Sequence, residues 1–466
     1  MTGVTGVSVY IPRYRLKREL IAQAWGGRSQ PGSKVISNFD EDALTMAQSA
    51  AWRVMADRRR PDRLFAASTS PPYWQRSMAS QIAAACDLEF TTATADFGGS
   101  LRSGFSALRA GIEAIDVGAA SDVIVVASDR RDPEPESADE LAFGDAAAAI
   151  RLGSQRTIAD VVAHASRSDD FLDEWRRDSD THVHGYSSKY TLSRGYEANV
   201  VALGKALLAQ AGVKASDIAV AALNTPDPRT AMTCAKHLGI APEHVCDGFS
   251  AVVGITGAAM PMLALAQALA AAKPDDLILA IGYGDGADGF ILRSVTPAAP
   301  LEITEPGALL YPSYSVYRKS RNFLRDDSRG PEISNVLWKR EERQNVRLHG
   351  TKCMECGTMQ FPLTRVCCRC RATEGLLEAP LPRTGSVFTF TKDYLYDAPM
   401  QPTVMVVVDL DGGGRFLCQM TDCDEREVRI GMPVELVLRR MRESAQNHSY
   451  YWKCRPVKQA PAKENA

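Results

Sequence analysis

The chain has 466 residues, and its 54 basic and 56 acidic side chains give a formal net charge of −2. A hydrophobic content of 45% is ordinary for a globular protein of two or three domains. The balanced charge gives no electrostatic reason to expect a nucleic acid or an anionic membrane as partner. We find no signal-peptide pattern and no apolar run of membrane-spanning length, so we expect a cytoplasmic protein without a membrane partner.

The first part of the chain alternates between apolar runs and helical patterns. Buried strands are predicted at Val4–Ile11, Leu64–Ser68, Thr92–Asp96 and Asp122–Asp129, and an amphipathic helix with an acidic start is predicted at Asp40–Met55. Continuous apolar strands separated by helices are typical of a parallel sheet covered on both faces. We therefore predict an α/β fold.

A weak internal repeat supports this interpretation. Two segments share a buried strand, a small-residue turn and a second apolar strand, and they span Asp122–Leu152 and Asp276–Leu292. A helix beginning at Ser100 has a counterpart near Gly254. Two fused copies of one α/β unit account for both pairs.

The stretch Ala95–Gly111 is where we expect the chemistry. A short apolar run ends in Gly98 and Gly99, and a helical pattern follows from Ser100. A strand, a glycine-rich turn and a helix point a side chain or backbone N–H groups at a buried ligand.

Five of the 11 cysteines fall in one short segment. Cys353-x2-Cys356 and Cys367-x2-Cys370 form two knuckles ten residues apart. Four thiolates give a closed tetrahedral Zn²⁺ site with no open position for a substrate, so we predict a structural zinc. Cys368 lies inside the second knuckle and is predicted to be a bystander. The alternative is a ribbon that has lost its metal.

The C-terminal part is predicted to be a small all-β barrel. Its strands are expected at Gly385–Lys392, Thr403–Leu410, Arg415–Met420 and Pro433–Leu438, with a hairpin turn at Asp411–Gly414.

A zinc ribbon beside such a barrel raises nucleic-acid binding as a hypothesis. Four aromatic residues could stack on bases: Phe388, Phe390, Tyr394 and Tyr396. No strong basic run accompanies them, so we expect that they fill the barrel and its edge, and that nucleic acid is not the partner.

The N-terminal part resembles the thiolase superfamily, in the branch that holds 3-hydroxy-3-methylglutaryl-CoA synthase and ketoacyl synthase III. The matching pieces are Gly6–Tyr14, Gly144–Ala149, Gly254–Ala266 and Tyr283–Gly286. The C-terminal part looks like the zinc-ribbon and OB-fold protein that accompanies thiolase-like enzymes as a separate subunit.

The resemblance implies a duplicated (βαβαβαββ)×2 five-layered domain, then a zinc ribbon and an OB-fold barrel. The expected domains are a thiolase-like condensing domain at 1–325, a connector at 326–349, a zinc ribbon at 350–380, an OB-fold at 381–457 and a disordered tail at 458–466. The resemblance also implies a homodimer and a coenzyme A thioester as substrate.

Enzymes of that family usually carry a nucleophilic Cys at the start of the central helix. Aligning Gly104–Leu108 with the family's helix places that Cys near Leu101, next to Ser100. The family's His, Asn and general-base Glu fall on Asn224, Ile255 and Thr69 respectively. None of the four positions keeps the expected residue.

The lost thiol changes the expected reaction. An acyl-enzyme would need Ser100 activated by a base, and Asn224 cannot accept a proton at neutral pH. Asn224 can still hydrogen-bond a thioester oxygen, and N–H groups near Gly254 and Ser100 can form an oxyanion hole. Such a site suits aldol or retro-aldol chemistry on a β-hydroxyacyl-CoA, which proceeds through an enolate.

The acid–base groups must then come from elsewhere. The candidates are Tyr73 and two residues of a polar loop, His184 and Tyr186. The alternative is that they are exposed loop residues. Arg102 either binds a phosphate or carboxylate of the substrate or is ion-paired.

Two further hypotheses remain open. A Claisen-type acyltransferase or synthase keeps the usual activity of the family. A catalytically silent scaffold that binds acyl-CoA would explain the loss of every expected catalytic side chain, whereas the retained glycine turns favour an enzyme.

Overall fold

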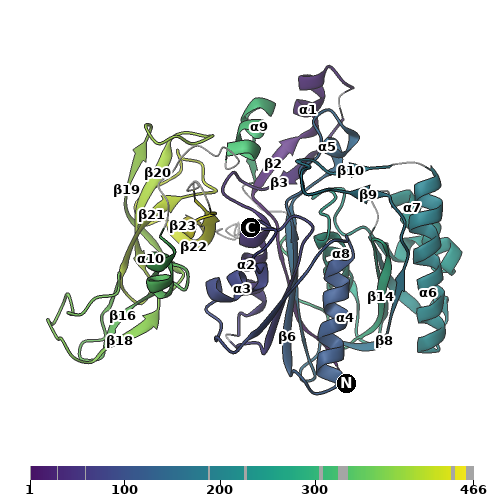
Figure 1. Ribbon diagram of the computed structural model, residues 1–466, viewed down its shortest axis with the longest axis horizontal. Coiled ribbons are helices and arrows are strands. Elements are labelled where there is room, and N and C mark those ends of the chain that lie inside the picture. The colour runs from purple at the N-terminus through teal and green to yellow at the C-terminus, as the bar shows by residue number, and fades with distance from the viewer. Residues whose placement is uncertain are drawn as a thin grey trace, which may run out of the picture. The chain divides into compact units, whose positions relative to one another are not determined.

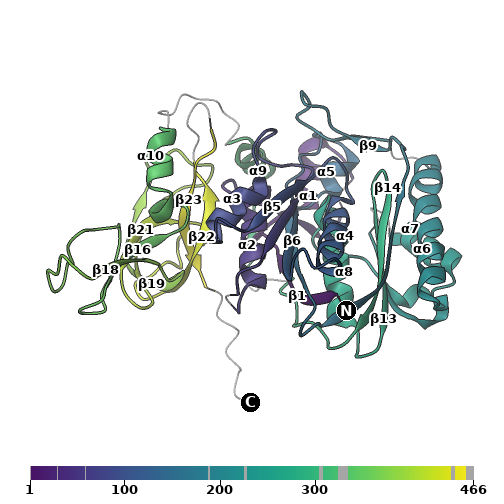
Figure 2. The ribbon, with the colours of Figure 1, turned by 60° about the horizontal axis from the view of Figure 1, so that its bottom comes forward.

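The computed structural model describes residues 2–28, 30–57, 59–186, 189–224, 228–303, 308–323, 334–441 and 447–457 (Figures 1 and 2). The chain forms two compact units. The first comprises Met1–Ser37, Asp42–Ala83 and Leu88–Thr304, and the second comprises Asn38–Glu41, Ala84–Asp87 and Glu305–Ala466. The tail predicted at 458–466 lies outside the described residues.

A ten-stranded sheet in the order β12-β11-β13-β14-β8-β1-β7-β6-β4-β5 organises the first unit. The strands of one half are β1 (Gly3–Tyr10), β4 (Arg63–Ala67), β5 (Ala93–Phe97), β6 (Asp122–Asp129) and β7 (Ala146–Gly153). Those of the other half are β8 (Ala159–Ser168), β11 (Ile218–Leu223), β12 (Val245–Cys246), β13 (Leu277–Tyr283) and β14 (Gly286–Ser294).

The two halves repeat one topology, which confirms the predicted duplication. In each half three strands are parallel and the other two continue antiparallel: β5, β4 and β6 are followed by β7 and β1, and β12, β11 and β13 by β14 and β8. The expectation of a parallel sheet is corrected to a mixed one. Gly284 and Asp285 alone connect β13 to β14, and such a short turn joins only antiparallel strands.

Five layers of helices and sheet make up this unit (Figure 1). The outer face of the first half is covered by α2 (Ala43–Val54), and that of the second half by α6 (Ala198–Ala211) and α7 (Pro228–Leu238). Between the halves α4 (Ser103–Asp116) packs against α8 (Ala259–Ala271), and both views show them as neighbours. In this middle layer, α8 is almost wholly buried and its side chains are nearly all apolar, because it faces sheet on both sides.

The helix predicted at Asp40–Met55 begins three residues later than expected, at Ala43. The carboxylate of Asp42 accepts the N–H of Thr45 at 3.0 Å and caps the helix. Shorter elements of this unit are β2 (Tyr14–Lys17), α1 (Arg18–Trp25), β3 (Ser33–Ile36), α3 (Met78–Ala85), α5 (Ala138–Ala142), β9 (Glu174–Trp175) and β10 (His184–Gly185).

The second unit combines short helices, a small sheet and a barrel. Its helices are α9 (Tyr314–Asn322), α10 (Asn335–Arg340) and α11 (Glu342–Asn345), and its small sheet has β16 (His349–Cys353) between β17 (Met359–Gln360) and β18 (Leu376–Pro380). The closed barrel contains β19 (Thr384–Asp393), β20 (Thr403–Leu410), β21 (Arg415–Met420), β23 (Tyr450–Pro456) and β22 (Pro433–Arg440).

The closed barrel confirms the predicted all-β barrel, and four of its strands were predicted from the sequence. The sequence analysis did not predict the remaining strand of this barrel, β23. Its residues Lys453 and Arg455 carry charges that are typical of a surface, yet both are buried. Arg455 Nε donates to Glu435 Oε1 at 2.7 Å on the neighbouring strand β22, so the charge is paired inside the fold.

Candidate active site and metal centre

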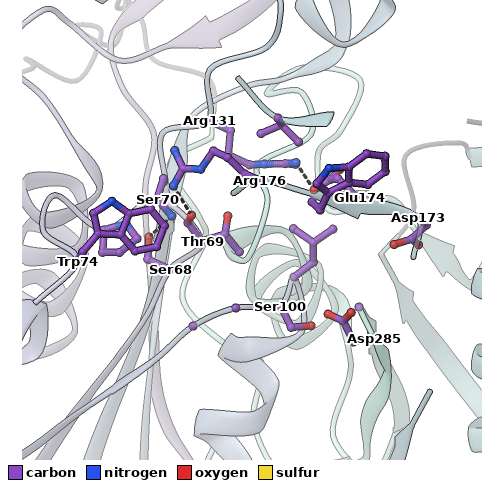
Figure 3. Close-up of a pocket in the computed structure, with 17 residues that line it drawn as sticks. Ser68, Thr69, Ser70, Trp74, Ser100, Arg131, Asp173, Glu174, Arg176 and Asp285 are labelled. Atoms are coloured by element: carbon purple, nitrogen blue, oxygen red, sulfur yellow. Dashed lines mark hydrogen bonds and ion pairs between the residues drawn. The ribbon is translucent and has the colours of Figure 1, made fainter. Parts of the chain in front are cut away.

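A cavity of about 320 Å³ lies in the first unit at the carboxyl ends of its parallel strands (Figure 3). Ser68–Pro71 follow β4, Gly98–Leu101 join β5 to α4, and Gly284 and Asp285 follow β13. Open α/β sheets bind ligands at this edge, because the connections there diverge and leave a crevice. The predicted location of the chemistry, at the start of α4, lines this cavity.

The start of α4 packs closely against the turn after β13. A methyl group on Gly284 would lie 2.7 Å from Ser100 Oγ, 2.8 Å from the nitrogen of Leu101 and 2.9 Å from that of Arg102. Only glycine therefore fits at position 284. Ser100 Oγ is buried and has no hydrogen-bond partner among the described residues.

Asp129, at the end of β6, fixes the wall of the cavity. It is fully buried, and its carboxylate accepts the N–H groups of Thr69 at 2.8 Å, Ser70 at 3.0 Å and Ala258 at 2.7 Å. It also accepts the hydroxyls of Ser68 and Thr69, each at 2.8 Å. A carboxylate with this many donors holds the turn after β4 rigidly.

Two arginines line the opposite side of the cavity from Ser100 in Figure 3. Arg131 is buried, forms an ion pair with Glu174, and stacks 4.2 Å from the ring centroid of Phe143. Burial opposes its charge, but Glu174 outweighs that effect and the pKa of Arg131 is raised. Arg176 donates to the carbonyl of Thr69 at 3.0 Å.

Asp173 and Tyr283 form an acid–base pair at this site. The Tyr283 hydroxyl donates to Asp173 Oδ2 at 2.6 Å, and Asp173 lines the cavity. Burial raises the pKa of Asp173; the hydrogen bond from Tyr283 lowers it in part, and the charges of Glu174 and Asp285 raise it further. Burial and the neighbouring Asp173 also raise the pKa of Tyr283. Asp173 is thus a carboxyl group of raised pKa in the lining of the cavity.

Of the residues predicted from the sequence, Ser100 and Thr69 line the cavity. Tyr73 is outside that lining and receives a hydrogen bond from Arg76 Nη1 at 3.3 Å. His184 lies on β10, with its Nε2 3.5 Å from Asp180 Oδ2, and Tyr186 is 60% exposed. The rings of both residues pack on Trp175, which itself lines the cavity.

The other predicted residues also lie outside the cavity lining and are engaged in the fold. Asn224 Oδ1 accepts the N–H of Tyr283 at 2.9 Å, and the turn residues after Asn224 are outside the described part of the chain. Arg102 donates to the carbonyl of Arg167 at 2.9 Å and lies 3.6 Å from the buried Asp288.

The N–H groups of Gly254 and Ile255 also have partners. They donate to the carbonyls of Ser250 at 3.0 Å and Ala142 at 2.9 Å. These two N–H groups are therefore engaged within the fold.

Comparison with known proteins places this geometry in a family. The family model for the C-terminal region of 3-oxoacyl-[acyl-carrier-protein] synthase III matches residues 208–292, and that for the C-terminal OB-fold domain of ChsH2 matches residues 378–439. Hydroxymethylglutaryl-CoA synthase of Pyrococcus furiosus is 30% identical over 293 residues, which cover 61% of this chain and 83% of that protein. The chain belongs to the hydroxymethylglutaryl-CoA synthase family. The Thermococcus onnurineus member is 29% identical and covers 68% of this chain and 95% of its own.

Solved structures agree on the fold of this family. Hydroxymethylglutaryl-CoA synthase complexed with CoA superposes with a TM-score of 0.60 at 17% identity, over 72% of this chain and 95% of that one. The 3-oxoacyl-(acyl carrier protein) synthase III of Pseudomonas aeruginosa PAO1 gives 0.56 at 20% identity, over 64% and 99%. These matches confirm the thiolase-like domain.

In this member of the hydroxymethylglutaryl-CoA synthase family, the seventeen described residues that line the cavity include no cysteine. The sequence analysis missed three acidic lining residues, Asp173, Glu174 and Asp285, because they carry no periodic signal. Asp285 alone was within a matching motif, the turn Tyr283–Gly286, and could have been singled out there.

A second candidate site is the predicted cluster of Cys353, Cys356, Cys367 and Cys370. Their sulfur atoms all lie within 4.8 Å of one another, and the Cys353–Cys370 and Cys356–Cys367 Sγ pairs are 3.6 Å apart. Four sulfurs at 2.3 Å from one tetrahedral ion would be about 3.8 Å apart. The residues fit a closed four-sulfur metal site, and Cys368 is exposed and outside the group.

The thiols of this cluster influence one another. Hydrogen bonds with the hydroxyl and the N–H of Thr358 lower the pKa of Cys356 to about 6. The N–H of Ala372 lowers the pKa of Cys370, but burial and the neighbouring thiols outweigh it and raise that pKa to about 12. A thiolate is the form that binds a metal.

None of the helices in the described ranges combines the length and apolar character needed to cross a bilayer.

Proposed function

We propose that this protein makes or breaks a carbon–carbon bond of an acyl-CoA thioester without a cysteinyl acyl-enzyme, by aldol or retro-aldol chemistry on a β-hydroxyacyl-CoA. The observation that carries the proposal is a cavity that joins oxyanion donors at the start of α4 with the carboxylate of Asp173 and is lined by no cysteine. Relatives named hydroxymethylglutaryl-CoA synthase and a neighbour complexed with CoA support a CoA thioester as substrate.

In the cleavage direction Asp173 removes the proton from the β-hydroxyl group. The bond between the α- and β-carbons breaks, a ketone or aldehyde leaves, and the electron pair passes into the thioester as an enolate. We assign the stabilisation of the enolate oxygen to the hydroxyl of Ser100 and the N–H group of Leu101, because both residues line the cavity. The enolate then takes up a proton at its α-carbon and gives the shorter acyl-CoA.

The state of Ser100 supports this role. A buried hydroxyl without a partner costs about 1–3 kcal/mol, so a ligand oxygen that accepts its proton would recover that energy. The same hydroxyl, together with the similarity to proteins named hydroxymethylglutaryl-CoA synthase, favours a second candidate, the Claisen-type synthase with an acyl group on Ser100. That reaction would need a base within reach of Ser100 Oγ.

The second unit extends the proposal. The four cysteines would hold a zinc ion that stabilises the ribbon, and with four sulfur ligands the ion would have no open position for a substrate. The homodimer and the cytoplasmic location expected from the sequence stay predictions.

A panel of β-hydroxyacyl-CoA and acyl-CoA thioesters tests the function, with mass spectrometry of free products and of the intact protein. We expect a shorter acyl-CoA and a carbonyl compound, and no covalent adduct. Asp173→Asn should slow turnover about 10²- to 10⁴-fold, which is the usual contribution of a general base. The exposed neighbour Asp170→Asn serves as control and should be unaffected. An adduct on Ser100 would favour the Claisen synthase, and binding without turnover would favour a silent scaffold.

A further inference from the structure

We propose that the acyl group carries an uncharged, apolar substituent on its β-carbon, and that the cavity discriminates against a carboxylate there. This inference rests on the proposed function, because it concerns the substrate of the same cavity. It separates this chain from a relative crystallised with 3-hydroxy-3-methylglutaryl coenzyme A, whose acyl group ends in a carboxylate.

The first argument is the charge of the lining. Three carboxyl groups face the cavity, those of Asp173, Glu174 and Asp285, against the two guanidinium groups of Arg131 and Arg176. Asp285 immediately follows Gly284, which touches the start of α4, so a carboxylate lies beside the oxyanion donors (Figure 3). An acyl carboxylate would add a second negative charge beside Asp285, which is exposed, so the two like charges repel through partly solvated surroundings.

The second argument is that both cations are engaged. The guanidinium of Arg131 is buried, paired with Glu174 and stacked on Phe143, so its charge is already balanced. Arg176 donates to the carbonyl of Thr69, and its guanidinium carbon lies 5.8 Å from the ring centroid of Trp74. The charge of Arg131 is thus neutralised by Glu174, and one N–H group of Arg176 is already used within the fold.

The third argument is the apolar part of the lining. Side chains of Pro71, Trp74, Leu101, Trp175 and Val183 all contribute. The indole of Trp74 is 70% exposed, although a large aromatic side chain is normally kept from water unless a ligand or partner covers it. An apolar acyl substituent gains from contact with these groups, whereas a carboxylate loses its hydration there.

Two thioesters of nearly equal size test the inference. 3-Hydroxy-3-methylpentanoyl-CoA has a methyl group where 3-hydroxy-3-methylglutaryl-CoA has its carboxylate. Dissociation constants and kcat/KM are measured for both with the full chain. We expect the uncharged thioester to bind at least tenfold more tightly and to be cleaved to acetyl-CoA and butanone with at least a tenfold higher kcat/KM.

Asp285→Asn should reduce the ratio of the two dissociation constants severalfold, because it improves binding of the charged thioester. Residue 285 has φ of +46°, a conformation that asparagine adopts as readily as aspartate, so the turn is preserved. The matched control is Asp275→Asn, which has φ of +69°, is exposed and lies at the other end of β13. It should leave the ratio unchanged.

The outcomes separate the two proposals. Equal or tighter binding of the charged thioester would overturn this inference whether or not either compound is cleaved, and so would an unchanged ratio in Asp285→Asn. Preferential binding of the uncharged thioester without turnover would contradict the proposed function and uphold the inference. Absence of binding by both thioesters would overturn both.

Discussion

The cysteine cluster and the active-site cavity are assembled in opposite ways. All four sulfur atoms come from one segment, Cys353–Cys370, whose two knuckles bring them within 4.8 Å of one another. The cavity draws its lining from segments that begin at Ser68 and end at Asp285, and its acid–base pair joins Asp173 to Tyr283 across 110 positions in the chain. Local spacing therefore specifies the first site, and strand order specifies the second.

The comparison also shows which kind of site tolerates change. A four-sulfur site loses its tetrahedral geometry when any one of its ligands is removed, because each thiolate is one of four equivalent contacts. For the active site, the sequence comparison predicts that the positions of the family's Cys, His, Asn and Glu hold Leu101, Asn224, Ile255 and Thr69. Backbone N–H groups can persist where side chains change, since they depend on the fold alone.

The largest effect is expected at the metal centre. Cys353→Ser should abolish metal binding and unfold the ribbon, because structural zinc contributes about 10–16 kcal/mol of apparent binding energy to folding. Metal content per chain and thermal unfolding measure this. Cys368→Ser, exposed and outside the group, should keep the metal. Full metal content in Cys353→Ser would show that the cluster is not the binding site.

Ser100→Ala tests the donors of the cavity. Loss of one donor to the enolate oxygen should lower kcat by about 10²-fold while the remaining N–H groups sustain measurable turnover. Stability should not fall, because Ser100 Oγ has no partner among the described residues. Total loss of turnover, together with an acyl adduct in the unsubstituted protein, would contradict the role of a donor.

Gly284→Ala tests the approach of the β13–β14 turn to α4. The added methyl group would lie 2.8 Å from the nitrogen of Leu101, so the start of α4 must move. A displacement of about 1 Å at the reacting centre costs on the order of 10²-fold in kcat/KM. Gly27→Ala is the control, because the nearest atom to its added methyl would be 3.8 Å away. Unchanged kinetics in Gly284→Ala would show that the position of the β13–β14 turn does not affect the reaction.

Tyr283→Phe should have the smallest effect, and one confined to low pH. The Tyr283 hydroxyl lowers the pKa of Asp173, so its removal raises that pKa further above the ordinary value. A base acts only when deprotonated, so activity is lost as pH falls through this pKa, and the acid limb of the profile should move to higher pH. The pH profile of kcat/KM measures it, with the exposed Tyr190→Phe as control. A uniform loss at every pH would indicate a purely structural hydroxyl.

Much of the fold could be predicted from the order of residues. The predicted bounds of β6, β20 and β21 agree with those observed, because alternating or continuous apolar patterns report burial directly. The duplication was visible in the strand pair Asp276–Leu292 and its counterpart Asp122–Leu152. Strand β23 was not, since the buried residues Lys453 and Arg455, which pair with Asp40 and Glu435, break the apolar pattern.

The sequence by itself determined the metal ligands and the importance of the start of α4. Both depend on residues close together in the chain, whose geometry the local backbone sets. Only the tertiary structure decided that Asp173, Glu174 and Asp285 face Ser100 across one cavity, and that Asn224 and Arg102 lie outside its lining. A carboxylate gains its role from burial and from distant partners such as Tyr283, and no property of the neighbouring sequence encodes them.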